Sequence, residues 1–269
     1  MRRTLYHYSL PFRGGGLREG FLLHLREQGE EGWGEIAPLP GFSRESLEEA
    51  FEDFCTYRYT LPSVQFGVYS ALCDLRGRVS LRAVPIKIKV KVGDLTLREC
   101  LRVINPAPTS YMRVDFNRRW SLHEALSFAE HFSEVEYFEE PLLPGEDARL
   151  FPYPVALDES LREGAFPPYP NVVAHVIKPT MHGVPLPAIQ RGVDFILSSS
   201  YETELGIHQI AKLSLRLKLP DRPMGLGTCH LFEDSLFENG VHMEEDMLYF
   251  PEEWRLKRGR VQNIFDEYI

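Results

Sequence analysis

The sequence predicts a closed β/α barrel preceded by a smaller α+β module, and three observations lead to this prediction. From Pro85 to about residue 231, short β-rich runs alternate with segments of helical length. Such alternation is typical of parallel strands joined by helices, and so many units in so short a span favour a closed barrel over an open sheet. The first 84 residues contain strands joined by turns and then two helical segments, and the alternation stops near Phe232. We therefore expect one domain at residues 1–84, completed by the tail 232–269, and a barrel domain at residues 85–231.

The N-terminal module is expected to combine a small antiparallel sheet with two helices. Its strands are predicted at residues 6–12, 21–26 and 33–36. Ser43 is the predicted N-cap of a helix that runs to about Tyr57, and Pro62 opens a second helix whose apolar residues recur at helical spacing. The run Gly14-Gly15-Gly16 lacks the lysine and hydroxyl residue of a phosphate loop, so we interpret it as a hairpin turn or mobile lid.

The barrel segment contains six strand-like runs separated by helix-like ones. The predicted strands are residues 86–92, 111–117, 135–139, 155–158, 172–178 and 193–200. The intervening helices include residues 95–103, 122–132 and 204–217. Since parallel strands of a barrel all end at one face, residues at these strand ends are the candidates for chemistry.

Composition excludes several classes of protein. A chain of 269 residues with a net charge of -9 can bury a large core and is not a general nucleic-acid binder, which would need basic side chains to neutralise phosphates. The four cysteines form no C-x-x-C pair, so neither a zinc site nor a disulfide framework is indicated. No signal peptide or membrane-length apolar run is visible, which leads us to expect a cytoplasmic protein acting on a small molecule.

Three acids lie at the ends of successive predicted strands: Asp115, Glu139 and Asp158. Any one of them alone would more often be a helix cap or a solvated loop residue. Three carboxylates that converge in a barrel mouth repel one another unless a cation lies between them. Because all the ligands are oxygen atoms, the expected ion is Mg²⁺, with Mn²⁺ as a second possibility.

Lysines accompany these acids. Lys87, Lys89 and Lys91 alternate along the first barrel strand and so share one face. On an edge strand they would be an ordinary solubility device, but this strand opens the barrel series, and Lys91 should lie nearest the mouth. Lys178 ends an almost wholly apolar strand and is followed by Pro179, so its ammonium group needs a polar or charged partner.

Further charged residues flank the predicted ligands. Arg113 shares a face with Asp115, one layer below it, where it either orients a ligand or, as we favour, neutralises the acids. Glu140 and Glu159 directly follow predicted ligands and should point away from the barrel axis. For these two we favour a capping or supporting role.

Together these motifs resemble the enolase superfamily, and in particular the dehydratases of its muconate-lactonizing-enzyme-like subgroup. The motifs are Lys89-Val90-Lys91-Val92-Gly93, Arg113-Val114-Asp115-Phe116-Asn117, Phe138-Glu139-Glu140-Pro141, Leu157-Asp158-Glu159-Ser160-Leu161 and Val176-Ile177-Lys178-Pro179-Thr180. The stretch from Gly32 to Ser43 also resembles the capping domain of that family, so the resemblance covers nearly the whole chain. It implies a modified (β/α)7β barrel with an α+β capping domain.

The resemblance also implies roles for individual residues. Asp115, Glu139 and Asp158 match the ligands of one magnesium ion. Lys91 matches the acid/base of a K-x-K motif, Lys89 its first lysine, and Lys178 the lysine on the other side of the barrel. Ser198, Ser200 and Gly225 match positions that hold the substrate.

The implied reaction is abstraction of the α-proton of a carboxylate followed by loss of water. Racemisation or epimerisation of N-acylated amino acids or dipeptides is the nearest alternative, since two opposed lysines could serve as two bases. A non-catalytic binding protein that keeps the barrel is a third interpretation. Turnover with added magnesium and substrate separates the enzymes from the binding protein.

Overall fold

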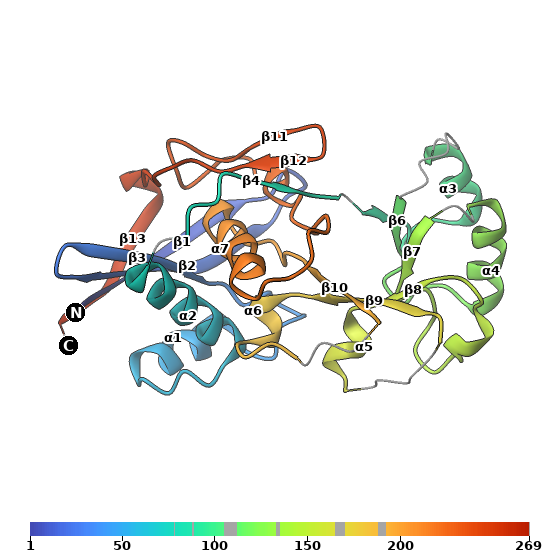
Figure 1. Cartoon of the computed structure of the whole chain (residues 1–269), viewed down its shortest axis with the longest axis horizontal. Coiled ribbons are helices and arrows are strands. Elements are labelled where there is room, and N and C mark those ends of the chain that lie inside the picture. Colours follow the sequence, from blue (N-terminus) through green and yellow to red (C-terminus); the bar gives the residue numbers. More distant parts are fainter. Residues whose placement is uncertain are drawn as a thin grey trace. The chain divides into compact units, whose positions relative to one another are not determined.

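The computed structural model describes residues 1–77, 79–87, 89–104, 112–132, 135–164, 170–187 and 192–268 (Figure 1). The chain divides by its internal contacts into two compact units. The first contains Met1–Ile86, Lys178–Pro187 and Leu197–Ile269, and the second contains Lys87–Ile177 and Ala188–Ile196. The domain division at residue 84, with residues 232–269 completing the first domain, stays a prediction.

A four-stranded antiparallel sheet, in the order β13-β1-β2-β3, underlies the first unit. Its strands are β1 (Arg2–Pro11), β2 (Leu17–Glu27), β3 (Glu30–Ile36) and β13 (Val261–Tyr268). Gln28 and Gly29 join β2 to β3 with φ values of 51° and 90°, which suit a two-residue hairpin turn. Gly15 and Gly16, both at a φ of 89°, lie in the turn between β1 and β2, so the predicted hairpin turn is confirmed.

Two helices, α1 (Leu47–Cys55) and α2 (Pro62–Arg76), pack on one face of this sheet (Figure 1). The predicted cap of α1 was wrong: Ser46, not Ser43, caps the helix, because Ser46 and Glu49 form a reciprocal capping box. Ser43 instead accepts a hydrogen bond from Leu39 N at 2.8 Å and so stabilises the preceding turn. The start of α2 at Pro62 is confirmed.

The contact between β3 and α2 depends on glycine. A Cβ atom added to Gly34 would lie 1.9 Å from the carbonyl oxygen of Gly67 in α2. Real Cβ atoms do not approach backbone oxygen so closely, and neither backbone can yield without moving the helix off the sheet. The Gly-Trp-Gly-Glu stretch therefore sets how closely α2 approaches β3.

We expect Gly34→Ala to lower the free energy of unfolding by about 1–3 kcal/mol or more, because the added methyl group overpacks this contact. Gly14→Ala is the matched control, since nothing lies within 4 Å of the position that its methyl group would take. The control should change stability by less than about 0.5 kcal/mol. Urea unfolding followed by circular dichroism measures both, and equal stabilities of the two variants would contradict the explanation.

The other face of the sheet packs against α7 (Glu204–Arg216) and the C-terminal tail. Glu35, at the end of β3, is 1% exposed and lies at the start of α7. Its carboxylate accepts hydrogen bonds from Tyr8 Oη at 2.5 Å, Thr203 Oγ1 at 2.6 Å and Gly206 N at 2.9 Å. Burial raises the pKa of Glu35 above its usual value, although the bonds from Thr203 and Tyr8 oppose that rise. Glu35 thus joins the sheet to the first turn of α7.

Smaller elements complete the first unit. They are β4 (Ala83–Pro85), α6 (Pro179–His182), a 3-10 turn (Cys229–Leu231), β11 (His242–Glu244), β12 (Met247–Tyr249) and a second 3-10 turn (Arg258–Arg260). β11, β12 and β4 form a three-stranded sheet in that order. Parallel bridges also pair Met224 with Ile86 and Gly225 with Ser198, so the short segment at Met224 and Gly225 has a neighbour on each side.

A buried histidine connects α7 to the tail of the chain. His208 is 5% exposed, its Nε2 lies 3.2 Å from Leu81 O, and its Nδ1 accepts a hydrogen bond from Trp254 Nε1 at 3.2 Å. Since Trp254 can only donate, the His208 ring is neutral with its proton on Nε2. Burial, aided by Lys212, lowers the pKa of His208 from 6.5 to about 3.

This histidine should make stability depend on pH. Between pH 6.5 and about pH 3 the unfolded chain binds a proton at His208 that the folded chain does not. The stability present above pH 6.5 is therefore lost as the pH falls, at about 1.4 kcal/mol per pH unit. His208→Gln keeps a donor toward Leu81 and should have a shallower pH dependence. Urea unfolding of both proteins at several pH values tests this, and parallel curves would refute it.

The second unit is built on parallel strands in the order β10-β9-β8-β7-β6-β5. The strands are β5 (Val90–Lys91), β6 (Met112–Asp115), β7 (Val135–Glu139), β8 (Val155–Leu157), β9 (Val172–Ile177) and β10 (Asp194–Leu197). Its helices are α3 (Leu97–Val103), α4 (Leu122–His131) and α5 (Glu159–Arg162), with a 3-10 turn at Ala148–Leu150. Each predicted strand has a counterpart here. Residues 88 and 111 of the predicted strands lie outside the described part.

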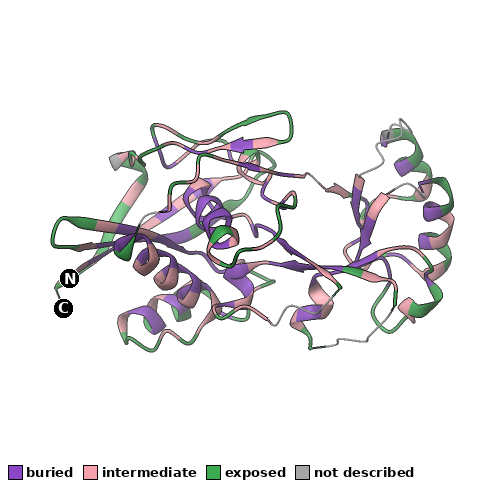
Figure 2. Ribbon diagram, viewed as in Figure 1, coloured by how far each residue is buried: buried purple, intermediate pink, exposed green. Residues whose placement is uncertain are grey.

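The two faces of this sheet have different neighbours. Phe116 and Phe138 pack edge to face against Phe128 of α4, which fills the layer between sheet and helix. Figure 2 shows the corresponding pattern on α4, where buried and exposed residues alternate at helical spacing. The opposite face carries Tyr137 in a small cluster with alanine, valine and isoleucine from the neighbouring strands. Because side chains alternate along a strand, Glu139 shares the face of Tyr137.

Candidate active site

The strand register brings a lysine and two acids into one row. Lys91 on β5 pairs with Asp115 on β6, and Asp115 pairs with Glu139 on β7. Glu139 in turn pairs with Ala156 on β8, and Asp158 follows two residues after Ala156. The predicted ligands therefore occupy the ends of three neighbouring strands, as the sequence indicated.

These three acids are buried. Asp115, Glu139 and Asp158 are 1%, 0% and 1% exposed. Lys89 donates a hydrogen bond to Glu139 Oε1, and its Nζ lies 3.3 Å from Asp115 Oδ2. Burial by itself would lower the pKa of Lys89, but the charges of Glu139, Asp115 and Asp158 raise it well above its usual value. The ammonium group of Lys89 is thus a cation held among the carboxylates.

The chemistry of this donor set fits a divalent metal ion. Three buried carboxylates supply only oxygen ligands, which Mg²⁺ prefers, and the strands hold them at one end of the sheet. The position of Lys89 shows that this end of the sheet already stabilises positive charge. Within the described ranges, no three His, Cys, Asp or Glu side chains are placed so that they could share an ion as they stand.

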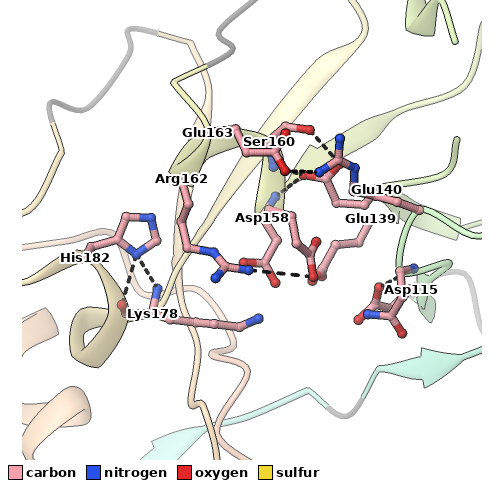
Figure 3. A network of polar contacts seen from close by, with 12 residues as sticks. Asp115, Glu139, Glu140, Asp158, Ser160, Arg162, Glu163, Lys178 and His182 are labelled. Carbon is pink, nitrogen blue, oxygen red and sulfur yellow. Dashed lines mark hydrogen bonds and ion pairs between the residues drawn. The ribbon is translucent and has the colours of Figure 1, made fainter. Parts of the chain in front are cut away.

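Glu140 fixes the backbone around Asp158 (Figure 3). Its carboxylate accepts hydrogen bonds from Asp158 N at 2.7 Å, from Ser160 N at 2.8 Å and from Ser160 Oγ at 2.8 Å. Burial raises the pKa of Glu140, although these bonds favour its charged form. Glu140 itself has a φ of 44°, an uncommon value that turns the chain sharply after Glu139. The capping role predicted for Glu140 is confirmed.

A second charged cluster lies nearer the N-terminal ends of the same strands. Arg113 is completely buried and donates to Glu136 through Nε at 3.1 Å and Nη2 at 2.8 Å. Lys87 donates to the same carboxylate at 2.7 Å. Burial would raise the pKa of Glu136, but the hydrogen bonds from Arg113 and Lys87 bring it below its usual value.

Sequence reasoning missed Glu136 for a physical reason. The register shifts by one residue between Met112 and Arg113, so Arg113 pairs with Tyr137, and Glu136 is the extra residue of a bulge. A bulge redirects a side chain that simple alternation would place on the other face. The charge of Arg113 is therefore balanced by Glu136. The predicted role of Arg113, to orient a ligand or to neutralise the strand-end acids, stays a prediction.

Apart from Lys91, the remaining predicted residues belong to the first unit. Lys178 directly follows β9 and is the N-cap residue of α6. Ser198 Oγ donates to Gly225 O at 3.1 Å, and Ser200 Oγ donates to Glu202 at 2.5 Å. A Cβ atom on Gly225 would lie 2.5 Å from Ser198 Oγ, so a larger residue there would require the Ser198 side chain to shift. Lys91 is exposed in the second unit.

Comparison with known proteins shows the family to which this chain belongs. Residues 1–75 match a family described as MenC, N-terminal domain, and residues 79–165 match one described as enolase C-terminal domain-like. The o-succinylbenzoate synthase of Edwardsiella ictaluri is 32% identical, with 87% of this chain and 92% of that protein covered.

Solved structures show the same fold. The o-succinylbenzoate synthase of Thermosynechococcus elongatus BP-1, whose structure holds Mg in the active site, has a TM-score of 0.66 at 23% identity and covers 87% of this chain and 95% of its own. Muconate cycloisomerase from Pseudomonas fluorescens has a TM-score of 0.73 at 17% identity, with 96% of each chain covered. The predicted barrel with an N-terminal capping domain is confirmed.

The matches to the two domain families and to the synthase of Edwardsiella ictaluri define an enzyme of the enolase superfamily. Within that superfamily, the chain belongs to the o-succinylbenzoate synthase family. In the part of the chain that is described, no helix is both long and apolar enough to cross a lipid bilayer.

Proposed function

We propose that this chain is an o-succinylbenzoate synthase. It would remove water from a hydroxy-cyclohexadiene carboxylate that bears a succinyl side chain, and so form the aromatic o-succinylbenzoate used in menaquinone synthesis. The observation that carries the proposal is the row of Lys91, Asp115 and Glu139 on adjacent parallel strands, in a chain 32% identical to a curated synthase.

Asp115, Glu139 and Asp158 would hold one Mg²⁺ ion, and Mn²⁺ would also suit these oxygen ligands. When bound, the ion would stabilise the negative charge that develops on the substrate carboxylate. Glu140 supports this function by fixing the backbone of Asp158. Supporting residues of this kind orient ligands and strengthen metal binding.

Lys91 is the proposed acid/base. Its neutral amine takes the α-proton of the substrate, and the ammonium so formed gives a proton to the departing hydroxyl on the same face. The carbon–hydrogen and carbon–oxygen bonds break, a ring double bond forms, and water leaves. Lys89 remains a charged partner of Glu139 and Asp115, and Lys178 stays cationic to stabilise the developing negative charge.

The proposal extends to the substrate site and to the state of the protein in the cell. Arg113, Ser198, Ser200 and Gly225 are proposed to shape the substrate site, and the substrate is a small carboxylate rather than a nucleic acid or a membrane. We further propose that the enzyme is cytoplasmic and monomeric. Light scattering on the purified protein tests the monomer, and a dimer mass would exclude it.

The direct test of the function is the ultraviolet change that accompanies formation of the aromatic ring. Purified protein with Mg²⁺ should convert the cyclohexadiene substrate at a rate proportional to enzyme concentration. A folded, magnesium-loaded sample that leaves the spectrum unchanged would exclude the synthase function.

Racemisation of N-acylated amino acids also uses two lysines, and Lys178 separates the two reactions. Elimination requires only that Lys178 stay cationic, whereas racemisation by two bases requires Lys178 to exchange protons with the substrate. Arginine keeps the charge but hardly ever deprotonates. We therefore expect Lys178→Arg to retain more elimination activity than Lys178→Ala and to show no racemisation.

A racemase would give a different result with labelled solvent. In deuterium oxide, the wild-type protein would exchange the α-proton of both enantiomers of an N-succinyl amino acid and would not aromatise the cyclohexadiene. Circular dichroism of both Lys178 variants controls for misfolding.

A further inference from the structure

Glu202, between β10 and α7, is a completely buried acid in the first unit. Its Oε1 accepts hydrogen bonds from Ser200 Oγ and Thr180 Oγ1, both at 2.5 Å. Its Oε2 accepts one from Ser200 N, also at 2.5 Å. A buried carboxylate is costly unless donors surround it, and these three bonds satisfy that need. Glu202 therefore joins the segment after β10 to α6.

The contact between Glu202 and Thr180 is linked through α6 to Lys178. Thr180 is fully buried in α6, the short helix whose N-cap residue is Lys178. The Lys178 carbonyl accepts hydrogen bonds from Met181 N at 2.9 Å and His182 N at 3.0 Å. His182 Nδ1 also lies 2.9 Å from that oxygen, as the dashed lines in Figure 3 show. The backbone from which the Lys178 side chain projects is thus tied to α6, and α6 is tied through Thr180 to Glu202.

A buried glutamate at position 202, bonded to a threonine and a serine, indicates a role beyond filling space in the core. An apolar side chain would fill the same buried position without the cost of burying a charge, and such replacements are often neutral or stabilising. A carboxylate with two oxygens can bind both segments at fixed distances, because each oxygen accepts from a donor on a defined atom. The contact links residues 22 positions apart, so it fixes the segment after β10 to the short helix α6.

We infer that Glu202 is a positioning residue for the synthase reaction, which acts through Thr180 on Lys178 and directly on Ser200. This inference rests on the proposed function. Because Glu202 is completely buried, its effect is to set where the ammonium group of Lys178 lies and how the Ser200 backbone is oriented. A misplaced charge stabilises the transition state less without weakening substrate binding in the same proportion.

Thr180 offers a matched pair of variants for the test. Thr180→Val keeps the shape but removes the hydroxyl that bonds Glu202, whereas Thr180→Ser keeps the hydroxyl. We expect Thr180→Val to lower kcat about 10- to 100-fold, with KM changed by less than about threefold. Thr180→Ser should restore most of the lost kcat. Glu202→Gln, which can still accept from Ser200 N and donate to the two hydroxyls, should lie between them.

A double-mutant cycle with Lys178→Ala shows whether the effect passes through Lys178. In that background Thr180→Val should cause no further loss of kcat, because the group that it positions is gone. An equal loss in both backgrounds, or a Thr180→Val enzyme with normal kcat, would overturn the inference while leaving the synthase function intact. Absence of wild-type turnover would overturn the proposed function and this inference together. Thermal unfolding of each variant confirms that the compared proteins are folded.

Discussion

Replacing Lys91 with alanine should lower turnover of the cyclohexadiene substrate by about 10²- to 10⁴-fold or more, because loss of a general base removes proton transfer in the transition state. Lys91 lies in register with Asp115 at the end of β5, beside one of the proposed metal ligands. Metal binding and fold should be largely unchanged. Steady-state kinetics and circular dichroism measure these two results.

Lys89→Ala is the matched control, since it removes the neighbouring lysine of the same strand. Lys89 is held as a cation by Glu139 and Asp115, so it is poorly suited to accept a proton. Its loss should lower turnover less than the loss of Lys91. A Lys91→Ala enzyme with nearly normal turnover beside an inactive Lys89→Ala enzyme would reverse the assignment of the base.

Removal of divalent metal should abolish activity, and added Mg²⁺ should restore it. Asp115→Asn, Glu139→Gln and Asp158→Asn should each weaken Mg²⁺ binding by at least about 10- to 100-fold, because each removes a charged ligand from a buried set. Isothermal titration calorimetry measures this effect without reference to activity.

Glu163→Gln is the control for the metal experiment, because Glu163 is an acid of the same unit whose side chain is 56% exposed. It should bind Mg²⁺ as the wild type does. Full turnover by protein shown by elemental analysis to be free of metal would refute the metal requirement, and equal affinity in all four variants would refute the ligand assignment.

Local patterns in the sequence were sufficient to predict much of this architecture. The strand at Val135–Glu139 and the start of the helix at Pro62 agree with the structure, because period-two alternation and a proline at the first helical turn are signals carried by neighbouring residues. The strand-end acids followed from the same reasoning, since parallel strands bring their carboxyl ends together. Even the wrong cap at Ser43 was an error of only three residues, between two serines that both precede the helix.

The tertiary structure alone decided which charged groups meet. A one-residue bulge between β6 and β7 directs Glu136 toward Arg113, and no feature of either strand taken separately marks that bulge. The contact of Glu202 with Thr180 joins the segment after β10 to α6, and the side chain of Lys89 forms ion pairs with both Asp115 and Glu139. The physical reason is that periodicity fixes the face on which a side chain lies, whereas its partner depends on strand register and on packing between residues far apart in the chain.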